Sequence, residues 1–333
     1  MMRPIVLRGH QRPLTKLRFN RDGDLLFSTA RDKIANIWYS HNGERLGTLE
    51  GHEGAIFSID ATPDSRITAT GAADGTVRLW NTQKGEFLKS WTTKATARHV
   101  EFSPDGNYLL VVTEEHFGCK GSLKFYPITQ KVDAQQVEEP EFVIENTGGV
   151  ATKFTIAAWS YDNEHVIAGL NDGSVARYNF RTGEKTHSAH NHESSVQDLQ
   201  TSLDKTYFVT ASKDKTSKLY ATDTLELIHS YDAQIPVNSA AITSVKDFII
   251  VGGGQEARDV TTTSAQEGDF KAKFFHKLFE EEIGEMKGHF GPINTIATDP
   301  RGQCYASGSE DGYVRLHHFD KSYFDFQYDL ERR

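Results

Sequence analysis

The sequence predicts an all-β fold, a single β-propeller of seven blades, and three observations support this prediction. A template of polar residues recurs with fixed internal spacing, and its starting points lie about 42 residues apart or further. Short β-prone runs recur along the whole chain, and each of them follows a turn signal. Four short strands in every ~40–45 residues are typical of propeller blades.

The polar template begins at a histidine. Eighteen positions later stands a serine or threonine, twenty-two positions later an aspartate, and twenty-eight positions later a side chain with a ring. The four copies are His10, Ser28, Asp32 and Trp38; His52, Thr70, Asp74 and Trp80; His192, Thr210, Asp214 and Tyr220; and His289, Ser307, Asp311 and His317. Four copies with identical spacing indicate a structural repeat.

The histidines set the register of seven units within one domain, residues 1–333. The expected blade starts lie near residues 10, 52, 94, 150, 192, 234 and 289. The two longer intervals predict insertions in the third and sixth blades. The second of these, residues 255–269, lengthens the turn between the second and third strands of blade six. A loop of that length either contacts a partner or packs on its own ring.

The strands themselves are predicted from seven β-prone runs, each after a turn signal such as Asp22-Gly23. The runs are 25–27, 66–69, 108–111, 165–168, 207–209, 248–251 and 304–306. Helical periodicity is confined to residues 274–282.

Both ends of the chain carry a prediction. Residues 3–7 occupy the place of a fourth strand before the first blade, and we expect them to close the ring by pairing with residues 313–316. The C-terminal tail, residues 319–333, has five aromatic residues among its first twelve. Such a tail either docks on the flank of the propeller, which we favour, or is presented to a partner.

The composition of the chain argues against several classes of function. The formal net charge of −9 disfavours direct binding to nucleic acid. Two cysteines, Cys119 and Cys304, provide no disulfide framework. No apolar run approaches the ~18 residues of a membrane span, and no signal-peptide core stands near the start. We therefore expect a cytoplasmic protein without a membrane partner.

The polar template resembles the repeat of the WD-repeat family, with Trp80-Asn81 standing where that family has its Trp-Asp pair. Tyr220 and His317 depart from the pattern. The resemblance implies a buried hydrogen-bond chain from indole to hydroxyl to imidazole to carboxylate. Ser28 with its histidine and aspartate has the composition of a nucleophile triad. Because the same trio recurs in every copy, we interpret it as structural and predict no catalytic residue.

Two further sequence patterns resemble a metal site and a phosphate-binding loop, but for both we favour a purely structural interpretation. His187 and His190 stand near His192 in the arrangement of a metal cluster, but His192 already has a place in the template. Residues 252–254 are three glycines after a β-prone run, without the Lys-Ser/Thr that a phosphate-binding loop needs. We predict neither a metal site nor a cofactor.

Four segments have a closer resemblance, to the family of i subunits of eukaryotic translation initiation factor 3. These segments are residues 2–15, 252–263, 287–294 and 310–319. The resemblance runs over the full chain and implies a non-catalytic scaffold in the complex that brings mRNA and initiator tRNA to the small ribosomal subunit. The implied partners are the b subunit, through its C-terminal segment, and the g subunit. The alternative is a WD-repeat signalling adaptor outside translation.

A candidate docking site for a basic partner lies in the fifth blade. The turns between the first and second strands and between the third and fourth strands share one face of a propeller. Asp204 and Asp223 occupy two such turns, so together they can bind an arginine or lysine of a partner. The alternative is that each is an ordinary turn aspartate.

Overall fold

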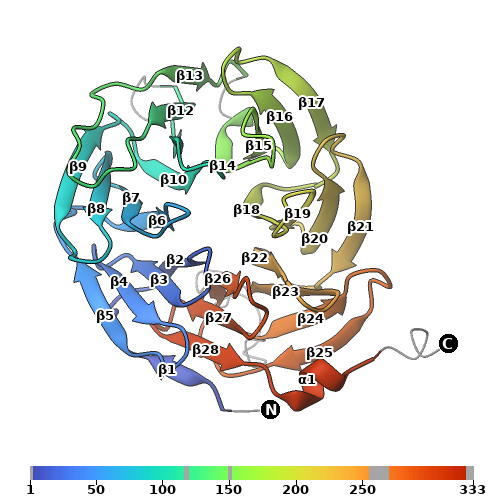
Figure 1. Cartoon of the computed structure of the whole chain (residues 1–333). Coiled ribbons are helices and arrows are strands. Elements are labelled where there is room, and N and C mark those ends of the chain that lie inside the picture. Colours follow the sequence, from blue (N-terminus) through green and yellow to red (C-terminus); the bar gives the residue numbers. More distant parts are fainter. Residues whose placement is uncertain (1–2, 116–119, 149–151, 255–269, 328–333) are drawn as a thin grey trace, which may run out of the picture.

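The computed structural model describes residues 3–115, 120–148, 152–254 and 270–327. They form seven antiparallel sheets of four strands each, arranged as a ring around a central channel (Figure 1). The predicted all-β, seven-bladed propeller is confirmed.

Each blade places one strand at the channel and three progressively further out. The innermost strands are β2 (Leu14–Phe19), β6 (Ile56–Ala61), β10 (Ala97–Phe102), β14 (Phe154–Trp159), β18 (Val196–Thr201), β22 (Val237–Ile242) and β26 (Ile293–Thr298). The second strands are β3 (Leu25–Ala30), β7 (Ile67–Ala72), β11 (Tyr108–Thr113), β15 (His165–Leu170), β19 (Tyr207–Ser212), β23 (Phe248–Gly253) and β27 (Cys304–Ser309).

The third and fourth strands complete the blades. The third strands are β4 (Ala35–Tyr39), β8 (Thr76–Asn81), β12 (Ser122–Pro127), β16 (Ser174–Asn179), β20 (Thr216–Ala221), β24 (Ala272–His276) and β28 (Val314–His318). The outermost strands are β5 (Arg45–Leu49), β9 (Phe87–Thr92), β13 (Phe142–Glu145), β17 (Lys185–His190), β21 (Leu227–Asp232), β25 (Glu282–Met286) and β1 (Ile5–Leu7).

The N-terminal strand closes the ring. β1 pairs antiparallel with β28, with Ile5 opposite Leu316 and Leu7 opposite Val314. Leu7 is buried in the apolar cluster between the first and last blades. Closure of the ring by the N-terminal strand is therefore confirmed.

The core lies between neighbouring blades rather than within one layer. Every residue of β3, β7 and β27 is buried, because each second strand has a blade on both of its faces. The outermost strands are far more exposed, and β17 has no fully buried residue. Burial on both faces explains why the second strands are apolar or small throughout instead of alternating.

The helical expectation for residues 274–282 is wrong. This stretch is the end of β24, a turn, and the start of β25. Phe274 and Phe275 face opposite sides of the sheet. Both side chains are buried, because a neighbouring blade covers each face. The apolar spacing that suggested a helix therefore reflects burial on both faces of a strand. The described residues contain one short α-helix, α1 (Lys321–Asp325), which the sequence pattern did not predict.

The aromatic tail lies on the flank of the sixth and seventh blades, where Figure 1 shows α1 beside β25. The ring of Phe319 stacks between Tyr305, at 5.7 Å, and Tyr323, at 3.8 Å between centroids. Phe326 meets the edge of Phe248 at 5.6 Å. These contacts match the docking alternative for residues 319–326, while residues 328–333 and the insertion at 255–269 lie outside the described part of the chain.

Candidate functional site

The first blade carries a complete hydrogen-bond chain through its polar template. Trp38 Nε1 donates to Ser28 Oγ at 2.8 Å, and His10 Nε2 lies 2.8 Å from the same oxygen. On the other side of the imidazole, Nδ1 lies 3.0 Å from Asp32 Oδ2. Asp32 also accepts the backbone N–H of Gln11 at 3.0 Å. The chain of contacts thus ties the third strand to the loop that enters the first strand.

The second blade repeats this geometry. Trp80 Nε1 donates to Thr70 Oγ1 at 2.9 Å, and His52 Nε2 lies 2.7 Å from that hydroxyl. His52 Nδ1 lies 3.1 Å from Asp74 Oδ2. The Thr70 hydroxyl is fully buried, so this trio joins strands and presents no reactive oxygen at the surface.

In the fifth and seventh blades the hydrogen-bond chain ends at the hydroxyl. The imidazole contacts there are His192–Thr210 (2.7 Å), His192–Asp214 (2.7 Å), His289–Ser307 (2.8 Å) and His289–Asp311 (3.0 Å). Tyr220 does not bond to Thr210, and its ring stacks on Phe208 at 5.2 Å and 11°. His317 does not bond to Ser307, and it stacks on Tyr305 at 4.7 Å and 4°. Ring stacking therefore replaces the indole hydrogen bond in these two copies.

Burial and pairing fix the charge states of the template. Burial lowers the pKa of His52, His192 and His289, which keeps these imidazoles neutral at pH 7. Burial alone would raise the pKa of Asp74, but hydrogen bonds, led by the one from Thr76, lower it to about 2. These three copies, in the second, fifth and seventh blades, therefore hold a neutral imidazole against a charged carboxylate.

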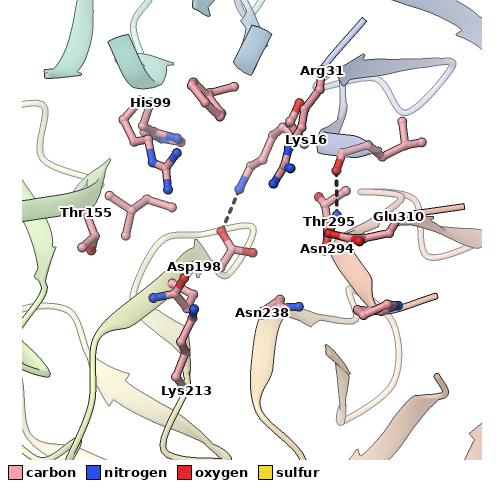
Figure 2. A pocket seen from close by; sticks show the side chains of 17 residues that line it. Lys16, Arg31, His99, Thr155, Asp198, Lys213, Asn238, Asn294, Thr295 and Glu310 are labelled. Atoms are coloured by element: carbon pink, nitrogen blue, oxygen red, sulfur yellow. Dashed lines mark hydrogen bonds and ion pairs between the residues drawn. The ribbon is translucent and has the colours of Figure 1, made fainter. Parts of the chain in front are cut away.

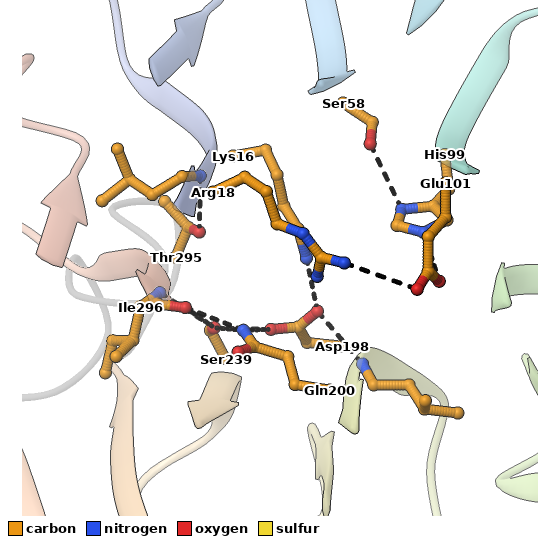
Figure 3. A network of polar contacts seen from close by, with 12 residues as sticks. Lys16, Arg18, Ser58, His99, Glu101, Asp198, Gln200, Ser239, Thr295 and Ile296 are labelled. Atoms are coloured by element: carbon orange, nitrogen blue, oxygen red, sulfur yellow. Dashed lines mark hydrogen bonds and ion pairs between the residues drawn. The ribbon is translucent and has the colours of Figure 1, made fainter. Parts of the chain in front are cut away.

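Charged side chains from the innermost strands meet across the centre of the ring (Figure 3). Lys16 Nζ of β2 lies 2.7 Å from Asp198 Oδ1 of β18, which links the first blade to the fifth. Arg18, also on β2, pairs with Asp60 of β6 at 3.1 Å and with Glu101 of β10 at 3.4 Å. The four partners other than Arg18 are buried. We call this set of contacts the channel network.

Further contacts strengthen the channel network and add the seventh blade to it. Lys205 Nζ, in the turn after β18, lies 2.9 Å from Glu101 Oε1, and Gln200 donates to the carbonyl of Ile296 on β26 at 2.7 Å. Burial acts to raise the pKa of Glu101, but Lys205 and the neighbouring cations hold it well below its usual range. Burial raises the pKa of Asp60. Removing one partner of such a buried pair costs about 3–5 kcal/mol, so the network fixes the relative positions of the blades.

The polar template did not reveal the channel network, because its residues do not recur at template spacing. The available signal was the presence of charged residues within inner strands, such as Lys16 in β2 or Glu101 in β10. Lys and Glu are seldom buried without a partner, so such positions indicate ion pairs.

One end of the channel opens into a cavity of ≈ 480 Å³ that is bordered by the starts of the inner strands (Figure 2). The ionisable residues that line it are Lys16, Arg31, Arg98, His99, Asp198, Lys213 and Glu310. Lysines and arginines outnumber carboxylates, although the whole chain is acidic. Two of these cations are ion-paired, Lys16 with Asp198 and Arg98 with Glu114.

The opposite end has a cavity of ≈ 360 Å³ at the ends of the inner strands, and its rim is more apolar and more exposed. Leu203 is 70% exposed and Tyr161 is 46% exposed, in turns of the fifth and fourth blades. Asp204 follows Leu203 directly and lines the same cavity. Exposed apolar side chains beside carboxylates are typical of a protein-binding surface.

Asp204 and Asp223 lie in the two turns expected, those between β18 and β19 and between β20 and β21. Asp204 Oδ1 accepts hydrogen bonds from Ser202 Oγ at 2.6 Å and from the backbone N–H of Thr206 at 3.1 Å.

Asp223 is held by the neighbouring blade. It accepts from Tyr161 Oη at 3.0 Å and from Arg177 Nη2 at 3.3 Å, yet its side chain remains 55% exposed. Within the described residues, no hydrogen bond or ion pair joins the two aspartates directly. Each carboxylate is oriented by its own partners and retains access to solvent.

The other chemical candidates are structural where they are described. His187 and His190 lie on the exposed strand β17, and no group of three potential metal ligands occurs among the described residues. A Cβ on Gly253 would lie 1.9 Å from the carbonyl oxygen of Pro236, and one on Gly252 would lie 2.5 Å from a methyl group of Ile296. Gly252 therefore permits close packing against the seventh blade, and Gly253 permits close packing within the sixth blade. In the described part of the chain, no helix is long and apolar enough to cross a membrane.

Comparison with known proteins places the chain in a family. The EIF3I family model matches residues 2–329. Eukaryotic translation initiation factor 3 subunit I of Aspergillus oryzae is 53% identical, with 99% of this chain and 98% of the relative covered. The proteins of the same name from Neurospora crassa (53% identical, 99% and 95% covered) and Botryotinia fuckeliana (52% identical, 100% and 99% covered) are similar to the same extent. The chain therefore belongs to the EIF3I family, the family of eukaryotic translation initiation factor 3 subunit I.

Proposed function

We propose that this chain is a non-catalytic scaffold subunit of eukaryotic translation initiation factor 3 in the cytoplasm. In this role it binds the b and g subunits and reaches the small ribosomal subunit only through the complex. The full-length match to relatives that carry the subunit name supports the assignment. The net charge of −9 favours basic protein segments over nucleic acid as direct ligands.

The observation that carries the proposal is the surface formed by Tyr161, Leu203, Asp204 and Asp223, which we call the acidic rim. It combines exposed apolar side chains with two exposed carboxylates in adjacent turns. An amphipathic basic segment, such as the C-terminal segment of the b subunit, complements both features. Lys205 ties the turn of Leu203 and Asp204 to the channel network, and Arg177 and Tyr161 orient Asp223, so little ordering is needed on binding.

Charge reversal of the acidic rim tests this proposal. We expect the double variant Asp204→Lys, Asp223→Lys to bind the C-terminal segment of the b subunit at least ~10-fold more weakly in a calorimetric titration. Asp105→Lys is the matched control, because Asp105 accepts from Ser103 in its turn as Asp204 does from Ser202. The control loses the same kind of turn cap in another blade and should bind normally. Equal affinity of the double variant and the native chain would contradict the role of this surface.

A further inference from the structure

A third cavity, of ≈ 220 Å³, lies on the flank of the ring, away from the channel. It is bordered by the sixth and seventh blades and by the docked C-terminal segment. The rings of Phe274, Tyr305, His317, Phe319 and Tyr323 line it. We call it the side cavity, and it shares no lining residue with the acidic rim.

Flat rings shape the side cavity. Tyr305 stacks on His317 with centroids 4.7 Å apart and on Phe319 at 5.7 Å, and Phe319 stacks on Tyr323 at 3.8 Å. Phe274 meets Tyr305 edge-on at 5.5 Å. Aromatic groups add binding free energy through offset stacking and edge contacts, so a cavity with these walls favours a planar aromatic ligand.

Three residues that line the cavity carry a buried polar atom without a hydrogen-bond partner among the described residues: Tyr305 Oη, His317 Nδ1 and Tyr323 Oη. The most deeply buried of these residues are Tyr305 and His317, which are only 1% and 5% exposed. Burial lowers the pKa of His317 to about 3, so the imidazole is neutral at pH 7 and its nitrogen can donate or accept according to tautomer. Buried polar groups in folded proteins are almost always paired, which indicates that a ligand supplies the missing partner.

The surroundings of the cavity indicate where such a ligand comes from. Phe324 and Phe326, beside the cavity on the C-terminal segment, are 41% and 39% exposed. The neighbouring strand β25 pairs only with β24, so it is the outer edge of its sheet. An exposed apolar patch next to a strand edge is typical of a surface that another polypeptide covers.

We propose that the side cavity binds the phenol ring of a tyrosine carried by a partner protein. A phenol offers a planar ring and one hydroxyl that both donates and accepts, which matches the aromatic walls and the unpaired atoms of Tyr305 and His317. A cavity of about 150 Å³ in another protein holds benzene, so this larger one has room for a substituted ring. This site goes beyond the proposed scaffold function and does not depend on the acidic rim.

The first test uses p-cresol, the tyrosine side chain as a free molecule, titrated into the full-length chain and followed by NMR. Gly284 lines the cavity, and a Cβ there would meet no atom within 4 Å, so Gly284→Leu fills the opening without a clash. Gly47 on β5 has the same open surroundings and does not line the cavity, which makes Gly47→Leu the matched control. We expect millimolar binding that Gly284→Leu weakens at least ~10-fold and Gly47→Leu leaves unchanged. No binding, or equal binding by both variants, would overturn the proposal.

The second test separates recognition of the hydroxyl from simple apolar filling. The native chain should prefer p-cresol over toluene by roughly fivefold, and Tyr305→Phe should reduce that preference while toluene still binds. Equal affinity for the two probes would show an apolar cavity only and would refute the assignment to tyrosine. A capped pentapeptide with a central tyrosine should bind at least as well as p-cresol. If p-cresol enters and the peptide does not, the ligand is a free small phenol and the partner-protein part of the proposal is wrong.

Discussion

The first two blades and the pair formed by the third and fourth blades are held together by different interactions. In the first two, an indole N–H of Trp38 or Trp80 ends a polar chain that runs to the loop entering the blade. Between the third and fourth blades, Trp159 lies in an aromatic cluster, 5.6 Å from Phe125 and 5.1 Å from Phe180. Its indole donates across the blades to a backbone carbonyl instead. Both arrangements stabilise blades, and each of these blades is a sheet of four strands.

The fifth and seventh blades are intermediate between these two solutions. They keep the imidazole, hydroxyl and carboxylate contacts but replace the indole with the stacked rings of Tyr220 and His317. The comparison teaches that a blade does not require the polar template. What every blade shares is a second strand covered on both faces by its neighbours.

Disruption of the aromatic cluster around Trp159 should lower the free energy of unfolding more than disruption of the polar template. Trp159 is completely buried, so Trp159→Ala leaves a large cavity between blades and should lower the free energy of unfolding by about 3–5 kcal/mol. Urea unfolding followed by circular dichroism measures this loss. A loss below about 1 kcal/mol would show that the third and fourth blades depend on other contacts.

Removing the closing strand should have the next largest effect. Deletion of residues 1–8 takes away β1 and the buried Leu7, and it exposes the edge of β28. We expect a stability loss of about 2–4 kcal/mol and a clearly lower melting temperature. A melting temperature equal to that of the full chain would contradict closure by this strand.

Acid should weaken the seventh blade through His317. Burial, assisted by the nearby His289, Arg315 and His318, lowers the pKa of His317 to about 3. An unfolded histidine has a pKa of about 6.5, so as pH falls below that value the unfolded state binds the proton first and stability decreases. The expected loss from this group is roughly 2 kcal/mol at pH 5 relative to pH 7.5.

The variant His317→Phe isolates this effect, because phenylalanine retains a flat ring on Tyr305 and cannot titrate. Its stability should fall less steeply between pH 7.5 and pH 5 than that of the native chain. Identical slopes in urea unfolding at the two pH values would exclude His317 as the source.

The smallest predicted changes in stability come from two variants, one that removes an indole and one that removes a hydroxyl group. Trp80→Phe removes the hydrogen bond to Thr70 and some buried volume, and should cost about 1–2 kcal/mol. Tyr305→Phe removes a buried hydroxyl that has no partner, and should change stability by less than about 0.5 kcal/mol or increase it. A larger loss for Tyr305→Phe than for Trp80→Phe would reverse the comparison.

The sequence was sufficient for the ring and its closure, because the spacing of the polar template and the turn signals report the repeat directly. It was misleading at residues 274–282, where Phe274 and Phe275 are both buried because blades cover both faces of the sheet. The channel network was not predicted, since Lys16 and Asp198 are far apart in sequence and meet only when the ring closes. The side cavity likewise depends on Phe319 and Tyr323 folding back onto Tyr305, which no local pattern encodes.

The most direct test of the scaffold role is affinity purification of the tagged, full-length chain from cytosol at physiological salt, with the co-purifying proteins identified and quantified. We predict recovery of the b and g subunits of translation initiation factor 3 in stoichiometric amounts. A different stable set of proteins, without those subunits, would contradict the scaffold role in translation and favour an adaptor elsewhere in the cell.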